Sequence, residues 1–588
     1  MEGAQSQTIP ALPAELSRLA RMMGFTDLPD KPAGESFWAE YKRITEQVHE
    51  IYRTLFYGAQ EDLEPNTPEN IRMLLLPEIT GEEVASRLAE AGFNDSQAAS
   101  KTFFRLRDAS QTLRLGSRSQ ILLARLLPVF IHRAALSPEP DRAIAYLERF
   151  VFSIGPRSTF YSLLAENPLV IDELMKIFGT SVFLSNRLIE RPESLDLLLS
   201  KELSVSYKKK ETFLAELDVT ADYEDVIEEL RRLKNQEVFR IGVNDIRGNL
   251  NERMITNQIT HIAQASLDAA LRVAAKALRP VYGAPLSSWF SVFGLGKLGG
   301  SELIYGSDLD IVFVYDTADA DCRTDGQKAI SCHEYFVKLA QRIISILTIR
   351  TREGFVFDVD ARLRPSGSSG PLVVSRSALL GYHSAATTVW ERQAWLKARP
   401  VAGNITAGSA ALAELAEVIY SRPLSAPDID EMLRIRQRME REIAKETKGR
   451  YNLKTGFGGL VDIEFLTQAL QLFAGAHDSS LRVAQTRKAL RRLYAAGMLE
   501  HEDYLFLKEA YSFYRLLELK QRIVTDRPDA SLIAGTDELT ALARRADYGD
   551  ADPGAKLLED YLRYAADTRA VFLKVLNALR ERCIPTGL

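Results

Sequence analysis

The stretch GLGKLGGSELIYGSDLDIVFVYD, residues 294–316, constrains the fold of this chain more than any other part of it. A glycine-rich turn leads into a run of β-branched and aromatic residues, which is typical of a buried strand. Asp308 and Asp310 stand at the start of that run, and residues two apart on a strand point to the same face. Taken alone, the pattern is compatible with a capped turn, a cation site or a phosphate site.

Further strand-like segments occur only near this stretch. We predict strands at 288–294, 310–316 and 354–363, which places a small mixed sheet at about residues 285–375. Elsewhere apolar residues recur every three or four positions, which predicts amphipathic helices. The predicted helices include residues 115–135, 141–152, 160–178, 222–238, 252–278, 432–443, 484–496, 502–524 and 555–582. The sequence therefore predicts an α+β fold, mostly helical, with a small sheet core followed by a C-terminal helical bundle.

The length of 588 residues exceeds what one hydrophobic core usually supports, so we expect several domains. We predict a helical N-terminal extension and linker at residues 1–114, with the linker itself at 56–70. A central domain at 115–425 would begin with a helical lead-in at 115–280 that precedes the sheet. The C-terminal bundle would then occupy residues 426–588.

Composition narrows the classes of protein that this chain can represent. No apolar run approaches the roughly 20 residues of a membrane-spanning helix, and the first residues lack the pattern of a secretory signal. Cys322, Cys332 and Cys583 are too few and too scattered to predict a disulfide framework or a thiolate metal site, which fits a reducing cytoplasm. The net charge of −5 gives no sign of a general attraction to nucleic acid. We expect a cytoplasmic protein that binds neither membrane nor nucleic acid.

The third predicted strand adds more acidic residues beside the first pair. If FVFDVDARLRP at 355–365 alternates regularly, Asp358, Asp360, Arg362 and Arg364 share one face. A structural ladder of ion pairs is one explanation, although cross-strand charge pairs stabilise a sheet by only about 0.2–1 kcal/mol each. A functional explanation accounts for both the aspartates and the arginines of this face. Hard cations such as Mg²⁺ prefer carboxylate and phosphate oxygens, while arginines bind phosphate. The pattern therefore favours nucleotidyl transfer assisted by one or two ions.

Known phosphate motifs do not explain the glycine turn. GLGKLGGSE lacks the GK[ST] ending of a P-loop, and a dinucleotide fingerprint would not be followed by acidic residues within ten positions. Gly299 and Gly300 would let backbone amides approach phosphate oxygens closely.

Four stretches resemble the glutamine-synthetase adenylyltransferases, a family of the nucleotidyltransferase superfamily, and occur in the family's order. They are GLGKLGGSELIYGSDLDIVFVYD (294–316), VDARLRPSGSSGPLVVS (359–375), WERQAWLKARPVAGN (390–404) and YNLKTGFGGLVDIEFLTQALQL (451–472). Weaker likeness covers 147–168, 184–199 and 230–246. The resemblance thus extends over about residues 115–580, and it implies that 115–425 is a nucleotidyltransferase domain.

The resemblance also implies roles for individual residues. Asp308, Asp310 and Asp360 would be catalytic and would bind Mg²⁺ as two ions, with Asp358 an uncertain neighbour. Asp360 is the candidate base for an attacking tyrosine hydroxyl, whose ordinary pKa lies near 10. The residues expected to contact ATP are Gly299, Gly300, Ser301, Ser307, Lys297, Arg362 and Arg364. Lys297 could equally be a solvated loop lysine. Trp390, Glu391 and Arg392 could lie near the nucleotide or belong to the core.

The segment KTGFGGLVDIEF at 454–465 resembles the start of the family's C-terminal helical domain. Its Asp462 and Glu464 could simply favour a helix N-terminus, a contribution of about 0.3–1 kcal/mol each. We predict no catalytic role for either residue.

The family's chemistry implies that ATP donates AMP to a tyrosine hydroxyl of glutamine synthetase, which regulates nitrogen assimilation, and that pyrophosphate leaves. A PII-type signalling protein is a further expected partner. Bifunctional members carry two copies, one attaching AMP and one removing it by phosphorolysis. This chain has one copy, which resembles the attaching C-terminal copy, so we expect a split half or a short member. AMP removal, a catalytically silent nucleotide-binding regulator and a polynucleotide nucleotidyltransferase are the alternatives, the last disfavoured by the acidic composition.

Overall fold

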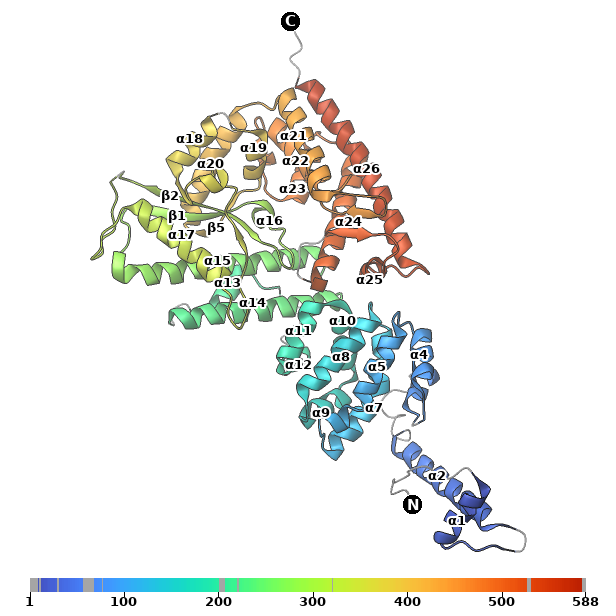
Figure 1. The fold of residues 1–588 in the computed structure, drawn as a ribbon. Coiled ribbons are helices and arrows are strands. Elements are labelled where there is room, and N and C mark those ends of the chain that lie inside the picture. Colours follow the sequence, from blue (N-terminus) through green and yellow to red (C-terminus); the bar gives the residue numbers. More distant parts are fainter. Residues whose placement is uncertain are drawn as a thin grey trace. The chain divides into compact units, whose positions relative to one another are not determined.

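The computed structural model describes residues 9, 12–28, 31–56, 68–76, 78–199, 203, 207–218, 222–319, 321–385, 387–525 and 530–583. The chain divides into two compact units, Met1–Met175 and Lys176–Leu588 (Figure 1). Helices dominate both units, and one small mixed sheet lies in the second, which confirms the predicted fold class. None of the described helices combines the length and the apolar character needed to cross a membrane.

The first unit is built from short helices around an apolar core that includes Leu88, Phe103 and Leu147. Its helices are α1 (Pro13–Met22), α2 (Ala33–Phe56), α3 (Glu69–Arg72), η1 (Met73–Leu75), α4 (Gly81–Glu90), α5 (Ser96–Arg107), α6 (Ala109–Thr112), α7 (Ser117–Ala135), α8 (Pro140–Ile154) and α9 (Ser158–Glu166). The next helix, α10 (Pro168–Thr180), begins in this unit. The single helix predicted at 160–178 is therefore wrong. Asn167 precedes a proline and has a non-helical backbone, with φ −132° and ψ 75°, which ends α9 there. The linker predicted at 56–70 falls largely outside the described residues.

The second unit begins with α11 (Val182–Glu190), η2 (Pro192–Ser194), α12 (Leu195–Leu199), α13 (Lys210–Ala215), α14 (Tyr223–Ile246) and α15 (Glu252–Tyr282). Its sheet contains β1 (Ser288–Gly294), β2 (Leu309–Thr317), β3 (Val359–Asp360), β4 (Val373–Ser375) and β5 (Arg399–Gly403). The order is β3-β2-β1-β5, and β4 also pairs with β2. β1 runs antiparallel to β2 and β5, whereas β2 runs parallel to β3 and β4. Two predicted strands, 288–294 and 310–316, are thus confirmed almost to the residue.

The third predicted strand, 354–363, is mostly wrong. Only Val359 and Asp360 pair with β2, and the chain turns immediately afterwards. The Arg364 guanidinium stabilises that turn by donating to the backbone carbonyls of Ala361, Ser368 and Gly370. Regular alternation therefore stops at Asp360, and the predicted four-residue charged face does not form. A side chain that bonds its own loop competes with strand pairing, and periodicity alone does not reveal this competition.

Helices cover both faces of the sheet. α15 and α17 (Cys332–Thr348) lie on one side, while α18 (Arg376–Ser384) and α20 (Ile405–Ser421) lie on the other (Figure 1). Between α18 and β5 runs the short helix α19 (Val389–Leu396). Another short helix, α16 (Gly296–Gly299), connects β1 to the loop that precedes β2.

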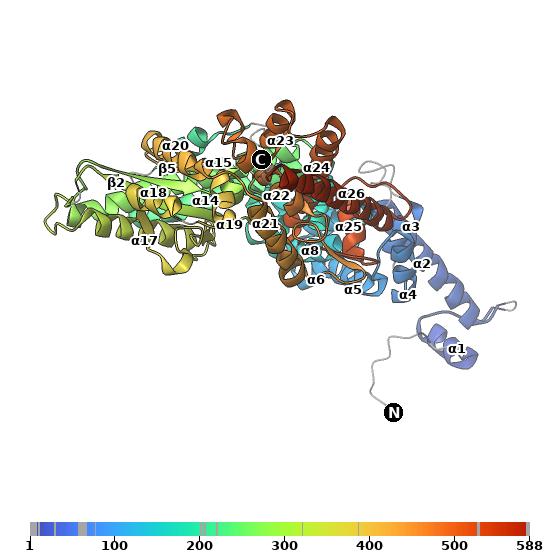
Figure 2. The same ribbon diagram turned by 90° about the horizontal axis from the view of Figure 1, so that it is seen from above.

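The C-terminal part is helical, as predicted. It comprises α21 (Ala426–Met439), the π-helical turn η5 (Glu440–Ala444), α22 (Leu460–Ala474), η6 (Ser479–Leu481), α23 (Thr486–Ala495), α24 (His501–Thr525), α25 (Asp537–Arg545) and α26 (Pro553–Arg582), with a ribbon of β6 (Arg450–Asn452) and β7 (Ser531–Ile533). Figures 1 and 2 show these helices gathered at one end of the sheet. Phe293 and Val312 of the sheet share one continuous core with Leu466, Tyr514 and Leu576. The domain boundaries at 114 and 425 stay predictions.

Two of the three cysteines form a disulfide, Cys322–Cys332. The sequence spacing of the cysteines does not predict a disulfide framework, yet the chain doubles back between Cys322 and Cys332. Arg323 pairs with Ser331, and the Cys332 amide donates to the Cys322 carbonyl at 2.9 Å. Disulfides are rare in a reducing compartment, so cysteine usage no longer supports the cytoplasmic expectation.

Candidate active site

Three aspartates meet at the edge of the sheet. Asp310 lies in β2 directly opposite Asp360 of the parallel strand β3, and Asp308 stands two residues before Asp310. One carboxylate oxygen from each of the three lies within 4.8 Å of the others. Such a set of convergent carboxylates is the donor type that hard divalent cations prefer. The structure therefore brings together the three residues that the sequence analysis selected.

The electrostatics of the cluster differ from residue to residue. Burial, and then the negative charges of Asp308 and Asp360, raise the pKa of Asp310 to about 6. Asp360 behaves in the opposite way, because hydrogen bonds from the Arg362 side chain hold its pKa below the usual value. Arg362 donates from Nε and Nη2 to both oxygens of Asp360, at 2.5–3.0 Å. In this cluster Asp310 therefore loses its proton less readily than an ordinary aspartate. Asp360 is ionised, and its negative charge is balanced by Arg362.

Gly296 is a site residue that the sequence analysis missed. Its φ is +52°, and a Cβ at this position would lie 2.2 Å from Oδ2 of Asp310. The backbone of the turn is thus pressed against the carboxylate, while the Leu295 amide donates to the Asp310 carbonyl at 2.9 Å. The signal was present in GLGKLGG, but the tight contact depends on how β1 and β2 pair.

Gly299 and Gly300 have a packing role in this structure. Their amides donate within the turn, to the carbonyls of Leu295 and Gly296 at 2.8 and 3.2 Å. A Cβ on Gly299 would lie only 1.8 Å from the carbonyl oxygen of Lys397. Glycine at 299 is therefore explained by close backbone packing, and a contact of either residue with phosphate stays a prediction.

Comparison with known proteins shows which families this chain resembles. Residues 171–414 match the family model described as glutamate-ammonia ligase adenylyltransferase. Residues 171–414 are thus similar to the glutamate-ammonia ligase adenylyltransferases, and we call this segment the adenylyltransferase domain. This adenylyltransferase domain contains all three aspartates and the glycine turn. A second model, described as GlnD PII-uridylyltransferase, matches residues 433–576.

Curated relatives of the whole chain carry a corresponding name, bifunctional glutamine synthetase adenylyltransferase/adenylyl-removing enzyme. The protein of Thioalkalivibrio sulfidiphilus is 34% identical over 537 residues, that of Methylococcus capsulatus 31% over 532, and that of Pseudomonas aeruginosa 31% over 556. Each alignment covers 87% of this chain and 54% of the relative. The chain therefore spans about half the length of the curated relatives it matches.

Lys297 of the adenylyltransferase domain lies in a buried group of ions. Its ammonium is 2.5 Å from Glu464, and Lys397 bridges Glu464 and Glu302 at 3.1 Å each. Burial is the main reason why the pKa of Lys297 is lowered, which Glu464 opposes. Its side chain is 18% exposed and paired with Glu464, so Lys297 is not a solvated loop lysine, and its contact with ATP stays a prediction. Glu464 instead acts as a link between α22 and the glycine turn.

The two predicted serines are engaged in local structure. Ser301 has φ +56°, and its hydroxyl accepts from Nη2 of Arg399 at 2.9 Å. The Ser307 hydroxyl accepts from the Ile304 amide at 3.0 Å, immediately before Asp308. Contacts of either serine with ATP stay predictions.

A cavity of about 250 Å³ adjoins the aspartate cluster. Ser307, Asp308 and Asp358 line it together with two cations that the sequence analysis did not select, Lys234 and Arg522. Lys234 lies over the rings of Phe355 and Phe357, and Arg522 donates to the Gly306 carbonyl at 3.3 Å. No local motif marks either cation, since they come from α14 and α24, far apart in sequence.

Replacing Gly296 with alanine should weaken cation binding at the aspartate cluster by at least about tenfold. The new methyl group would displace the Asp310 carboxylate, and the left-handed backbone would add roughly 1 kcal/mol of strain. Titration of the variant with Mn²⁺, followed by electron paramagnetic resonance, measures the affinity. Gly497→Ala is the matched control, because Gly497 has φ +71° and a methyl group added there would meet no other described part of the chain within 4 Å. Equal affinities in the two variants would contradict the contact described here.

Proposed function

We propose that this chain transfers AMP from ATP to a tyrosine hydroxyl of glutamine synthetase. The convergence of Asp308, Asp310 and Asp360 inside the adenylyltransferase domain is the observation that carries the proposal. The names of the relatives support the choice of acceptor. A silent regulator is not favoured, because none of the three carboxylates is missing.

The aspartates fit a divalent cation, and we propose that Asp308, Asp310 and Asp360 hold Mg²⁺ as one or two ions. The three carboxylates lie close together, and the pKa of Asp310 is raised by burial and by repulsion from the other two. A bound cation would reduce this repulsion. When bound, Mg²⁺ supplies charge neutralisation for phosphate oxygens. The cations lining the neighbouring cavity, Lys234 and Arg522, would add attraction for a triphosphate.

Asp360 is our candidate for the group that receives the tyrosine proton. Its lowered pKa keeps it ionised at neutral pH, so it can accept a proton. Arg362 now occupies both of its oxygens, and its own side chain is 76% exposed. We propose that Arg362 leaves Asp360 when substrate binds and turns to the phosphates, where its planar donors match the oxygens.

We propose that the helices after residue 425 bind protein partners. Their match to a PII-uridylyltransferase model supports a PII-type protein as a regulatory partner, beside glutamine synthetase as the substrate. We further propose that the protein acts in the cytoplasm, where both partners would be met.

The proposal is tested by incubating the protein with labelled ATP, Mg²⁺ and its cognate glutamine synthetase. Attachment predicts labelled AMP on a tyrosine of the synthetase and release of pyrophosphate. Removal predicts instead that adenylylated synthetase and inorganic phosphate yield ADP. Label in neither direction would contradict the proposed function, and ADP formation alone would favour the adenylyl-removing reaction.

The affinity for Mg²⁺ should depend on pH through Asp310. Below its pKa of about 6 a proton competes with the cation, so the affinity should fall about tenfold between pH 7.5 and pH 5. Isothermal titration calorimetry at the two pH values measures the change.

Without a cation, the stability of the folded chain should also depend on pH through Asp310, but in the opposite direction to the Mg²⁺ affinity. Because folding raises the pKa of Asp310, the folded chain binds the proton more tightly, and its free energy of unfolding falls as pH rises from about 4 to about 6. Asp310→Asn removes this dependence and is the control. An affinity for Mg²⁺ that is equal at both pH values would exclude Asp310 as a ligand.

A further inference from the structure

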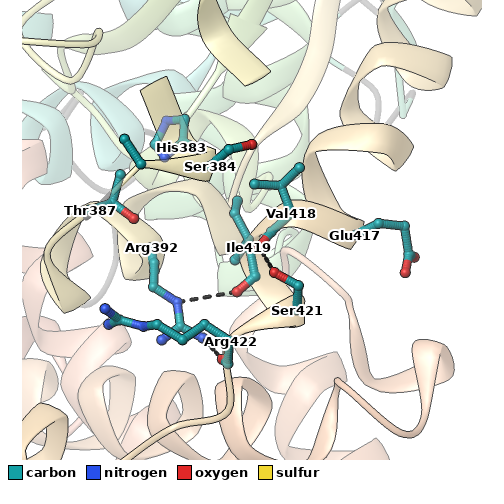
Figure 3. Close-up of a pocket in the computed structure, with 10 residues that line it drawn as sticks. His383, Ser384, Thr387, Arg392, Glu417, Val418, Ile419, Ser421 and Arg422 are labelled. Carbon is teal, nitrogen blue, oxygen red and sulfur yellow. Dashed lines mark hydrogen bonds between the residues drawn. The ribbon is translucent and has the colours of Figure 1, made fainter. Parts of the chain in front are cut away.

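A second cavity, of about 580 Å³, lies at the C-terminal edge of the adenylyltransferase domain and is lined from α18, α19, α20 and the chain beside them. Figure 3 shows His383, Thr387, Arg392 and Ser421 around it, with Glu417 at the edge of the group. A volume of this size suits a small metabolite. None of the three aspartates lines this cavity.

Arg392 is the most unusual group in the cavity wall. It is 2% exposed, and it donates from Nε to the Ile419 carbonyl at 3.2 Å and from Nη2 to the Arg422 carbonyl at 2.6 Å. These bonds, of which Figure 3 shows the first, cap the C-terminal end of α20. Its third nitrogen, Nη1, is buried without a hydrogen-bond partner among the described residues. Capping of α20 accounts for the burial of two nitrogens of this guanidinium, but it does not account for the burial of Nη1.

His383 also has hydrogen-bonding groups without a partner among the described residues. The ring is 5% exposed, and neither nitrogen has a partner among the described residues. Burial lowers the pKa of His383 to about 4, so the imidazole is neutral at physiological pH and offers one donor and one acceptor. Trp395 and Tyr382 contact the ring edge to face, which fixes its orientation.

Among the described residues no acidic side chain forms an ion pair with Arg392, although the charge of Asp428 favours the charged guanidinium. Glu417 forms an ion pair with Arg482, and Arg422 pairs with Asp428 at 2.7 Å. The Ser421 hydroxyl donates to the Val418 carbonyl of its own helix and can still accept. Leaving a buried charged donor unsatisfied costs more free energy than leaving a neutral donor unsatisfied. The cavity thus has a buried guanidinium with one unpartnered nitrogen beside a neutral imidazole.

We propose that this cavity is a binding site for a small anionic metabolite that bears a carboxylate or phosphate group. An anionic oxygen accepts from Nη1 of Arg392, and a second polar group of the ligand bonds His383. The proposal does not depend on the AMP-transfer function. The cavity is nevertheless connected to the glycine turn of the candidate active site. α19 leads from the cavity wall to Lys397, whose carbonyl packs against Gly299.

The test uses the full chain without Mg²⁺, titrated separately with inorganic phosphate and with succinate by calorimetry. Ala385→Trp places an indole at the cavity rim; Ala385 is exposed and has an extended backbone, so this variant should fold. Arg392→Met removes the unpartnered nitrogen. Ala410→Trp is the matched control, because Ala410 is an exposed residue of α20 outside the cavity lining.

We expect at least one of the two anions to bind the parent chain, Ala410→Trp and Asp310→Asn equally well. Ala385→Trp and Arg392→Met should each weaken that binding by at least about tenfold, a difference of about 1.4 kcal/mol. Binding of phosphate alone or of succinate alone would identify the class of anion. Three results would overturn the proposal: no binding of either anion, unchanged binding in Ala385→Trp, or loss of binding in Asp310→Asn.

Discussion

Replacing Asp310 with asparagine is expected to lower the proposed AMP transfer by at least about a thousandfold, or about 4 kcal/mol of activation free energy. Asparagine keeps the size of the side chain but removes the charge that lies between Asp308 and Asp360. Single-turnover transfer of labelled AMP to glutamine synthetase measures the loss. The fold should be retained, because the substitution removes a charge that is disfavoured by burial and then by repulsion from Asp308 and Asp360, the causes that raise the pKa of Asp310.

Asp316→Asn is the matched control for this experiment. Asp316 lies on the same strand, β2, but pairs with Arg376 outside the aspartate cluster. It should change transfer little. Binding of glutamine synthetase should also persist in Asp310→Asn, since a large protein contact does not depend on one carboxylate. Near-normal transfer by a folded Asp310→Asn protein would show that the three aspartates do not perform the chemistry.

Replacing Asp462 with alanine should destabilise the second unit by about 3–5 kcal/mol. Asp462 is fully buried and accepts from Arg436, itself 1% exposed, and from Nε of Arg569 at 2.7 Å. Removing the carboxylate would leave the Arg436 guanidinium in the core with the carbonyls of Thr455 and Gly456 and with Glu440, 3.2 Å from its Nη1, but without its buried counter-charge. Urea denaturation followed by tryptophan fluorescence measures the shift.

Asp430→Ala is the control, because it breaks an exposed ion pair of the same helical region. Asp430 and Arg580 are 41% and 42% exposed, and pairs of this kind contribute at most about 1 kcal/mol. A loss below about 1 kcal/mol in Asp462→Ala would instead support the helix-dipole role that the sequence suggested. Asp462→Asn should fall between the two, since the amide oxygen can still accept.

Local sequence was sufficient to predict the central strands. The run of β-branched and aromatic residues at 288–294 and 310–316 specifies strands wherever those segments pack, because the pattern is local. The spacing of Asp308 and Asp310 likewise places them on one face without knowledge of any neighbour. Resemblance to a known family then supplied Asp360 as the third carboxylate, and the short parallel pairing of β2 with β3 brings it opposite Asp310.

Tertiary structure decided which partners the other predicted residues have in the folded chain. Lys297 and Arg364 carry the charge that binds phosphate, but Lys297 is held by Glu464 and Arg364 bonds its own loop. Sequence specifies the chemistry of a side chain, whereas its partners come from segments that meet only when the chain folds.

The same reason explains Gly296 and Asp462. A glycine in a turn and an aspartate near a helix start both have ordinary local explanations, and the sequence by itself determined no more than those. The tight approach of Gly296 to Asp310 arises from the pairing of β1 with β2, and the burial of Asp462 arises from α21 and α26 packing on α22. Contact distance and desolvation, which set the energies at both positions, are properties of the packed chain and are not encoded in any single segment.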